Sequence, residues 1–507
     1  KRQMLKHSIK TKAILLILAI QTLIILNVDG QAYYYDELKE GATLFDLGPG
    51  RNKDLTFDES FVQVSKVNPS YFELTNGQPY IAIGANICWG DMFYMKRWMK
   101  KISANGGNFA RVWLSDSRFE IDNPVYKGTE WPNAKALENI DSLLVWAERF
   151  HLKLMFCVED CRRIYAEKEG NGSNVKPVYH VDNGGPFNNM AEYVNTTAGK
   201  QVYIDRINVY KEHFGNHPAI FGWELWNEMD AIEPPYPSYT NWTKYMLPVV
   251  KKVFPCNLVM QSLGSYDKNG CRQAYSEVIQ MADNEVGQIH RYIDEDASTL
   301  PICKGPMDLL AADAISVLRS YNQKKPLLLS ETGAVQPKHA GPHEIYDADV
   351  EGMLMHDMLF TPFFCGAAGT GFPWHWDGTY IEKNNLWYHL QRFANAVKDT
   401  NPLQEQFIPE QFTVDNLRLY VLTGKGQVLV WCRDANNTWI TELRNKISPS
   451  LLQGKKIDLI SILKDKQLQN CEVYDPWTDK WIIPVVTEDE VYLPDFKRSL
   501  VLRFTIK

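Results

Sequence analysis

Short apolar segments alternate with amphipathic stretches along most of the chain, beginning near residue 60. Leu137, Ile140 and Leu144 recur at helical spacing before one such segment, and Ile204 and Ile207 do so before the next. This alternation is typical of parallel strands joined by helices. Eight apolar segments therefore predict an α/β fold with a closed (β/α)8 TIM barrel. The segments are Tyr80–Asn86, Asn108–Leu114, Leu152–Glu159, Ile220–Trp226, Asn257–Leu263, Val286–His290, Pro326–Glu331 and Gly369–Trp374.

The loops of this barrel are predicted to be enlarged, because about 340 residues occupy a fold that typically needs about 250. The largest excess is Tyr165–Val194, which follows the third strand and is rich in Gly, Asn, Pro and Tyr. Before the barrel, Phe61–Ile83 predicts paired strands that turn at Asn76-Gly77, a dipeptide typical of hairpins. We assign the hairpin and the barrel to residues 32–400.

After about residue 400 the pattern changes to short β-rich runs separated by turn residues. This pattern predicts a small all-β sandwich over residues 401–507. Aromatic residues gather in Tyr474–Trp481, where we expect packing at turns rather than ligand binding. The predicted strands are Leu417–Leu422, Gln427–Cys432, Cys471–Tyr474, Lys480–Val485 and Leu500–Ile506.

The first residues of the sequence have the pattern of a targeting segment. Five basic residues precede the apolar run Ala13–Leu26, and small residues follow near Gly30. The run is shorter than the about 20 residues of a membrane span, and the whole is typical of a secretory signal. We expect residues 1–31 to be a signal peptide and the protein to be secreted or periplasmic. An uncleaved anchor is the alternative, and no later segment is apolar enough to span a bilayer.

Composition narrows the range of partners. The 54 Lys and Arg against 61 Asp and Glu give a formal net charge of -7. Without an excess of positive charge the chain is not drawn to phosphate backbones, so nucleic acid is not an expected partner. The nine cysteines have no zinc-binding spacing. Cys256 and Cys271 are candidates for a disulfide. Because the number of cysteines is odd, at least one thiol stays unpaired within the monomer, and we assign no disulfide pattern.

Two glutamates occupy corresponding places at the ends of distant predicted strands. The fourth strand runs into Asn227-Glu228, and the seventh ends at Glu331. In a closed barrel both lie at the carboxyl-terminal mouth, where catalytic residues gather. Two carboxyl groups that face each other across a sugar-sized gap are what a retaining glycosidase needs, one as nucleophile and one as acid and base.

These segments resemble glycoside hydrolase clan A, most closely its family of cellulases and mannanases. The resemblance implies that Asn227 holds the sugar 2-hydroxyl, that Glu228 is the acid/base and that Glu331 is the nucleophile. It also implies that Arg111 on the second strand steadies the nucleophile. An arginine beside Glu331 would favour its ionised form, which agrees with that role.

Further residues fit the same resemblance. His290 and Tyr292 match a pair on the sixth strand, with Tyr292 bonded to Glu331. Either Trp374 or Trp376 matches the aromatic platform of the eighth strand, because a flat apolar ring can hold the C–H face of a pyranose. Each of these residues alone also suits an ordinary packing or pairing role.

The third strand departs from the family pattern. Where the family often has a histidine, this chain continues Glu159-Asp160-Cys161-Arg162-Arg163. Glu159 and Asp160 are candidates for substrate contact or for local pairing with the two arginines. Glu224, four residues before Glu228, is expected to be a buried, paired carboxylate. The departure leaves the sugar preference open.

The sequence thus predicts an exported retaining glycoside hydrolase that acts on a poly- or oligosaccharide, with no metal or organic cofactor. A transglycosidase that uses the same pair of glutamates is an alternative, because both enzymes pass through the same glycosyl ester. A carbohydrate-binding scaffold without turnover is a further alternative. The sugar, the linkage and internal or terminal cleavage are not determined by the sequence.

Overall fold

The computed structural model describes residues 58–122, 126–128, 130–160, 178–232, 234–264, 271–322 and 324–507. The predicted signal peptide, residues 1–31, lies outside the described residues, as does the first part of the predicted long loop, residues 165–177. Phe57–Lys507 forms one compact unit. Among the residues that the structure describes, no helix is long and apolar enough to cross a bilayer.

Parallel strands form a TIM-barrel-like ring. β4 (Gly84–Asn86), β5 (Phe109–Trp113), β6 (Lys153–Glu159), β7 (Ile220–Trp226) and β8 (Leu258–Met260) pair in sequence order in one sheet, and β9 (Gly287–Ile293) pairs in parallel with β10 (Leu327–Ala334). The Glu285 amide donates to Val259 O at 3.0 Å, which links the second group to the first. Seven of the eight predicted strands are confirmed in type and order.

The eighth predicted strand, Gly369–Trp374, is not a regular strand. It makes two isolated parallel bridges, Ala82 with Gly369 and Thr332 with Pro373. The segment lies between the first and seventh barrel positions and completes the ring. Proline lacks the N–H that a strand ladder needs, and glycine weakens a strand, which explains the irregular pairing.

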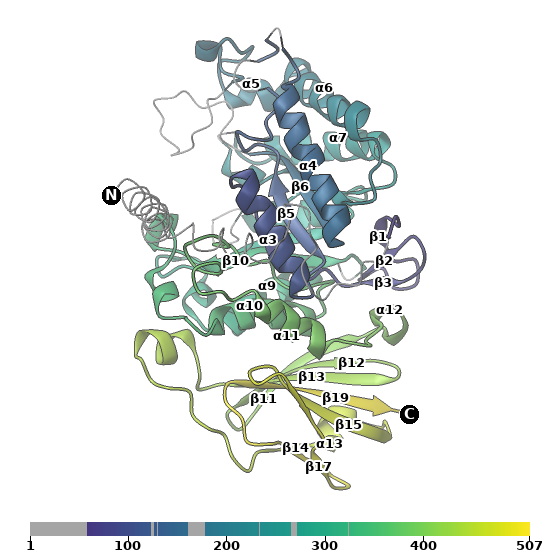
Figure 1. The fold of residues 1–507 in the computed structure, drawn as a ribbon, viewed down its shortest axis with the longest axis vertical. Coiled ribbons are helices and arrows are strands. Elements are labelled where there is room, and N and C mark those ends of the chain that lie inside the picture. The colour runs from purple at the N-terminus through teal and green to yellow at the C-terminus, as the bar shows by residue number, and fades with distance from the viewer. Residues whose placement is uncertain are drawn as a thin grey trace, which may run out of the picture. The chain divides into compact units, whose positions relative to one another are not determined.

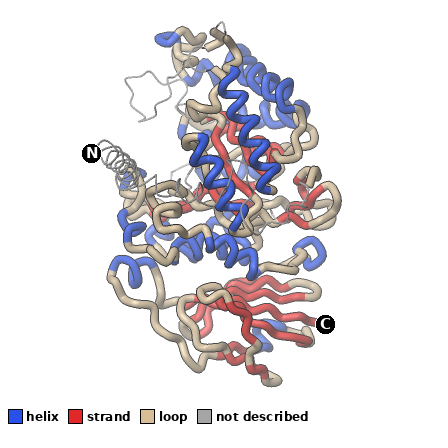
Figure 2. The backbone as a smooth tube through the Cα atoms, viewed as in Figure 1, coloured by secondary structure: helices blue, strands red, loops and turns tan. Residues whose placement is uncertain are grey.

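Helices surround the strands, and an amphipathic helix such as α4 buries its apolar face in the protein interior. In α4 the predicted periodic positions Leu137, Ile140 and Leu144 are all buried. Figures 1 and 2 show α3 and α4 packed across β5 and β6. The helices of the barrel region are α3 (Met92–Ala104), α4 (Ala134–Phe150), α5 (Met190–Asn195), α6 (Thr197–Phe214), α7 (Ser238–Val253), α8 (Cys271–Gln280), α9 (Met307–Tyr321), α10 (Met353–Phe364), α11 (Tyr388–Ala396) and α12 (Pro402–Glu405).

The predicted hairpin covers the amino-terminal end of the barrel. β1 (Val62–Val64), β2 (Phe72–Leu74) and β3 (Pro79–Tyr80) form an antiparallel sheet, and Gly77 in the turn before β3 has a φ of 87°. A positive φ is accessible to glycine without strain. The Phe72 ring packs edge-on against Phe221 of β7, with ring centroids 5.1 Å apart. The hairpin thereby closes the core below the strands.

The C-terminal part consists of two antiparallel sheets. One has the order β11 (Ile408–Val414), β12 (Leu417–Thr423), β13 (Gln427–Asp434), β19 (Ser499–Ile506), β15 (Leu468–Asp475) and β16 (Lys480–Ile482), and the other β14 (Lys456–Asp458), β18 (Glu490–Tyr492) and β17 (Val485–Val486). Side chains of both sheets and of α13 (Leu459–Leu463) form one hydrophobic core. The predicted run Lys480–Val485 is divided between β16 and β17, and β11, β14 and β18 were not predicted from the sequence. The boundary at residue 400 stays a prediction.

The candidate disulfide between Cys256 and Cys271 is not formed. All eight cysteines among the described residues are free thiols. Cys271 is buried and donates to Asp230 Oδ2 at 3.6 Å, whereas Cys256 is exposed.

Buried ion pairs join the C-terminal sheet to helices of the barrel. Arg433 of β13 donates to both carboxylate oxygens of Asp357 in α10, at 2.9 and 3.2 Å. Arg418 of β12 likewise holds both oxygens of Asp308 in α9, at 2.5 and 3.0 Å. Burial raises the pKa of Asp357, and the charge of Arg433 opposes that rise. A bidentate arginine therefore holds a carboxyl that could not stay charged by itself.

Substitution Arg433→Met should lower the free energy of unfolding by about 3–5 kcal/mol, because it leaves the buried carboxyl without its partner. A carboxyl whose pKa is raised by folding stabilises the folded state fully below its unfolded-state pKa, which is about 3.9. This stabilisation is lost as pH rises through the folded-state pKa. The loss in R433M should therefore be larger at pH 8 than at pH 5. Urea unfolding at both pH values measures it.

The matched control is Arg444→Met, which removes an exposed pair with Glu295 across the same junction. Exposed pairs contribute about 0–1 kcal/mol, so R444M should unfold nearly like the parent protein at both pH values. Equal losses for R433M at pH 5 and pH 8 would contradict the role of the Asp357 charge.

Candidate active site

Glu331 lies on β10, at the carboxyl-terminal mouth of the ring, and its side chain is 4% exposed. Arg111 Nη1 donates to its Oε1 at 2.6 Å, and the Tyr292 hydroxyl donates to its Oε2 at 2.6 Å. Burial raises the pKa of Glu331. The positive charges of His290 and Arg111 and the hydrogen bond from Tyr292 act in the opposite direction. The expected contacts of Glu331 with Arg111 and Tyr292 are both present.

Arg111 of β5 is entirely buried and connects the polar groups below the mouth. Its Nε and Nη2 donate to the two oxygens of Glu224, at 2.6 and 2.9 Å. Nη2 also donates to Asn227 Oδ1 at 2.7 Å, and Nη1 to Asn86 Oδ1 at 3.2 Å. Glu224 is thus the buried, paired carboxylate that we expected.

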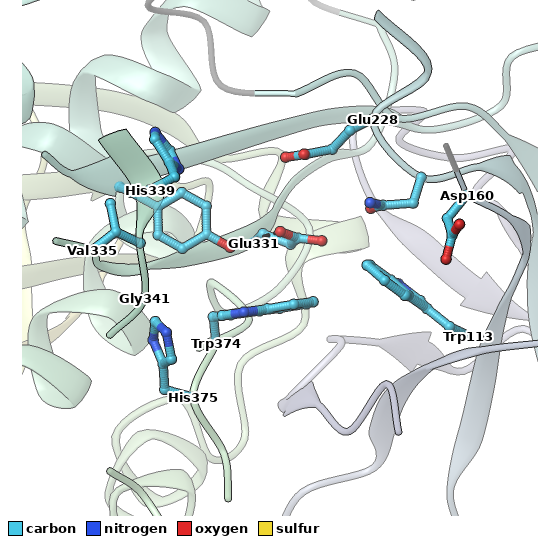
Figure 3. Close-up of a pocket in the computed structure, with 11 residues that line it drawn as sticks. Trp113, Asp160, Glu228, Glu331, Val335, His339, Gly341, Trp374 and His375 are labelled. Carbon is cyan, nitrogen blue, oxygen red and sulfur yellow. Dashed lines mark hydrogen bonds between the residues drawn. The ribbon is translucent and has the colours of Figure 1, made fainter. Parts of the chain in front are cut away.

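Glu228 is the second residue after β7, and its side chain is 28% exposed. Its φ is 47°, a left-handed conformation that residues other than glycine rarely adopt. Its amide donates to Ser262 Oγ at 3.2 Å, and its Oε1 contacts His290 Nδ1 at 2.8 Å. This unusual backbone turn directs the carboxyl toward the mouth rather than along the strand (Figure 3).

His290 of β9 lies between the two glutamates. Besides the contact with Glu228, its Nδ1 is 3.4 Å from Glu331 Oε2. Burial alone would lower the pKa of His290, but the carboxylates of Glu331 and Glu228 raise it above its ordinary value. One ring nitrogen therefore interacts with both acids.

One carboxylate oxygen each of Glu228 and Glu331, together with a ring nitrogen of His290, lie within 4.8 Å of one another. By geometry these three donor atoms are also a possible set of metal ligands. Arg111 and Tyr292 already occupy both oxygens of Glu331, however, and the arginine charge opposes a second cation at that carboxylate. We therefore read the cluster as a hydrogen-bonded acid pair, and the absence of a metal stays a prediction.

A cavity of about 220 Å³ opens above Glu331. In Figure 3, Glu331 lies at its centre between Glu228 and the ring of Trp374. The rings of Trp113 and Trp374 have centroids 5.6 Å apart, which makes one wall aromatic. The residues that line it are Trp113, Asp160, Asn227, Glu228, Tyr292, Glu331, Val335, His339, Gly341, Trp374 and His375.

Of the two candidate platform residues, Trp374 lines this cavity and Trp376 does not. Trp376 is 1% exposed and packs edge-on against Trp89 and Trp374, with centroids 4.8 and 5.1 Å apart. Strand alternation would direct both side chains to the same side. Between them, His375 has a φ of 58°, and this left-handed residue turns the chain. Trp376 therefore packs against Trp374 away from the cavity, and its position does not favour the candidate platform role.

The two neighbouring acids at the end of the third barrel strand, β6, have different surroundings. Glu159 is buried and paired with Arg206 Nη1 at 3.1 Å, whereas Asp160 lines the cavity and accepts from Ser115 Oγ at 2.9 Å. Arg162 and Arg163, the local partners considered from the sequence, lie outside the described residues.

Sequence reasoning missed several residues of the lining. Trp113 could have been predicted from the sequence, because it is two residues after Arg111 on the same strand. Strand alternation directs both side chains to one face. His339 and His375 carried none. Both have a positive φ, at 55° and 58°, and His339 ends a short 3-10 helix that periodicity does not predict. The pKa of His375 is lowered to about 4 by burial, so its ring is neutral near pH 7.

Comparisons with known proteins identify the fold. No family model and no curated protein sequence match the chain. A solved structure described as a glycoside hydrolase is 12% identical and covers 88% of this chain and 97% of its own, with a TM-score of 0.56. A glycoside hydrolase family 5 structure from Bacteroides vulgatus is 13% identical and covers 89% and 95%, with a TM-score of 0.58. The chain therefore has a fold like that of glycoside hydrolase family 5.

Proposed function

We propose that this protein is a retaining glycoside hydrolase that cleaves a β-glycosidic bond of a poly- or oligosaccharide. The observation that carries the proposal is the close approach of Glu228 and Glu331, which have carboxylate oxygens within 4.8 Å of each other. Retaining enzymes need about 5–5.5 Å between the two carboxyl groups, and inverting enzymes about 6.5–9.5 Å to admit a water. A short separation favours direct attack by one carboxylate.

In the proposed first step, a carboxylate oxygen of Glu331 attacks the anomeric carbon and the bond to the leaving oxygen breaks. Glu228 gives its proton to that oxygen, which leaves a glycosyl ester on Glu331 and a carboxylate on Glu228. In the second step, Glu228 takes a proton from water and the resulting hydroxide attacks the anomeric carbon. The ester opens, the sugar leaves, and both glutamates return to their starting states.

The charges around the pair support one proton on the cluster, and the exposure of the two glutamates supports its place on Glu228. Arg111 is always cationic, and the raised pKa of His290 favours its cationic form. Together they face the carboxyls of Glu224, Glu228 and Glu331. One proton on a carboxyl makes this five-residue cluster neutral, and a buried cluster without net charge is the less costly state. Glu228 is the more exposed of the two candidate acids, and a leaving group can reach it.

The cavity supports a sugar as the substrate. Trp374 and Trp113 offer flat apolar faces, while Asn227, Asp160 and the two glutamates offer hydrogen-bonding groups at the rim. A pyranose has the same division into C–H faces and equatorial hydroxyls. We propose that Trp374 is the platform beneath the sugar that undergoes cleavage.

We also propose that residues 1–31 direct export and that the two C-terminal sheets form a sandwich. The basic and apolar pattern of Ala13–Leu26 supports the first. The common hydrophobic core of the two sheets supports the second.

Glu331→Ala should lower kcat/KM on an aryl β-glycoside by at least about 10³-fold, because the covalent step is lost. Added azide should restore turnover as a glycosyl azide of inverted configuration, since the small anion attacks from the vacated side. Product configuration by NMR measures this. Glu344→Ala, an exposed carboxylate, is the control and should keep full activity. If E331A loses hydrolysis but forms no glycosyl azide, the assignment of Glu331 as nucleophile is contradicted. If the parent protein transfers the sugar to a sugar acceptor instead of hydrolysing the substrate, a transglycosidase is favoured.

Tyr292→Phe should move the acidic limb of the kcat/KM profile to higher pH. A nucleophile acts as the carboxylate, so activity rises as pH increases through the pKa of Glu331 in the free enzyme. The Tyr292 hydroxyl stabilises that carboxylate and lowers its pKa, so removal of the hydroxyl raises the pKa further. The matched control is Tyr245→Phe, which removes an exposed hydroxyl. A limb that stays in place or moves to lower pH in Y292F would contradict this role of Tyr292.

A further inference from the structure

His375 lines the cavity with a backbone conformation that residues other than glycine rarely adopt. Its φ is 58°, in the left-handed region, and the Ile381 amide holds this turn by donating to His375 O at 3.2 Å. Figure 3 shows the His375 ring on the Val335 side of Trp374. Uncommon backbone conformations cluster at functional sites, so an observed one gives a hypothesis of function. The left-handed turn brings an imidazole to the cavity wall.

Tyr346, a buried residue outside the cavity lining, contacts this imidazole. Its Oη accepts from the Ala334 amide at 2.6 Å and lies 3.2 Å from His375 Nδ1. The Tyr346 ring stacks on Tyr380 with centroids 4.1 Å apart, and the Tyr380 hydroxyl donates to Asp349 at 2.6 Å. A strand amide and a stacked ring therefore fix the hydroxyl that faces His375.

Gly333 leaves the space in which Tyr346 and His375 meet. It lies on β10, two residues after Glu331. A Cβ at this position would be 2.7 Å from Tyr346 Oη and 3.5 Å from His375 Nδ1. Glycine permits such a close approach to the backbone, whereas a larger residue would push Tyr346 away. The contact between Tyr346 and His375 thus depends on a glycine beside the candidate nucleophile.

The Tyr346 hydroxyl determines which nitrogen of His375 carries the proton. Burial raises the pKa of Tyr346, so the hydroxyl keeps its proton. Among the described residues, His375 Nδ1 is the acceptor within reach of that proton, and a buried donor without an acceptor is costly. Tyr346 therefore donates to Nδ1. Burial lowers the pKa of His375 to about 4, and a neutral imidazole that accepts at Nδ1 has its N–H at Nε2.

We propose that His375 is a specificity-determining residue that donates a hydrogen bond from Nε2 to a hydroxyl oxygen of the bound sugar, and that Tyr346 is the positioning residue that keeps the proton on Nε2. This inference rests on the proposed glycosidase function. Ionised carboxylates in the cavity wall can only accept hydrogen bonds, whereas a neutral imidazole N–H donates one without adding a charge. The His375 side of the cavity thereby recognises a sugar oxygen as an acceptor.

Paired changes in protein and substrate test this donor. The fastest substrate among 4-nitrophenyl β-D-glucoside, mannoside and galactoside is compared with its 2-, 3-, 4- and 6-deoxy derivatives, for the parent protein and for His375→Ala. At one position, loss of the hydroxyl should lower kcat/KM of H375A by about 3–10-fold less than that of the parent, because the hydrogen bond is already absent. At the other positions both proteins should lose equally.

His375→Gln provides a rescue and a second test if H375A does not fold. The glutamine amide carries N–H donors at the end of a side chain of similar reach, but it is always neutral. H375Q should therefore keep the discrimination of the parent at the responding position to within about 3-fold.

The tautomer is measured by ¹⁵N NMR of protein labelled in histidine, with H375Q to identify the His375 signals. The parent should show a protonated Nε2 and an unprotonated Nδ1 at pH 7. Tyr346→Phe removes the donor to Nδ1 and keeps the ring that stacks on Tyr380. Both tautomers should then be populated, and the discrimination should shrink at the same position. A purely structural role of Tyr346 would leave the tautomer unchanged.

His213→Ala is the matched control, because His213 is exposed, pairs with Asp141 at 2.9 Å and does not line the cavity. It should keep the pattern of the parent. Equal losses in the parent and in H375A at every deoxy position, or a proton on Nδ1 in the parent, overturn the inference while the glycosidase function stands. If the parent protein cleaves no glycoside, both are overturned.

Discussion

The site depends on a single buried guanidinium. Arg111 has no exposed surface, and moving a cation out of water costs several kcal/mol unless its partners compensate. Its partners are Glu224 and Glu331, with the amide oxygens of Asn86 and Asn227 at its edges. Because the fork is planar and its donors are fixed, it also sets the direction of each partner. Removal of this one side chain would take away both hydrogen bonds to Glu224, one of those to Glu331 and the one to the side-chain oxygen of Asn227.

The rest of the barrel holds that fork in position. Arg111, Glu224 and Glu331 come from β5, β7 and β10, so their contacts form only when the ring is closed. The ring is closed on one side by an irregular segment that pairs at two isolated points, and Asn86 Nδ2 fastens that segment by donating to Phe372 O at 2.9 Å. The same asparagine touches Arg111. Closure of the fold and the position of Arg111 beside Glu331 are therefore coupled through one amide.

The two halves of the cavity rim differ in chemistry. On the side of Asp160 and Asn227, polar groups are anchored by strand ends and by a buried hydrogen-bond network. On the opposite side, His339 and His375 lie on irregular segments, and burial keeps the His375 ring neutral near pH 7.

The order of the strands, the two glutamates at their ends and the supporting Arg111, His290 and Tyr292 could all be predicted from the sequence. The strands and the two glutamates follow from local periodicity and from the rule that parallel strands end at one mouth. Arg111, His290 and Tyr292 were expected from the resemblance to glycoside hydrolase clan A. The choice between Trp374 and Trp376 was decided only by the tertiary structure, because a left-handed residue between them cancels strand alternation. The same holds for the pairing of Glu159 with Arg206 and the exposure of Asp160 to the cavity. Such outcomes depend on partners that lie far along the chain, and no local pattern records which distant side chain fills a given space.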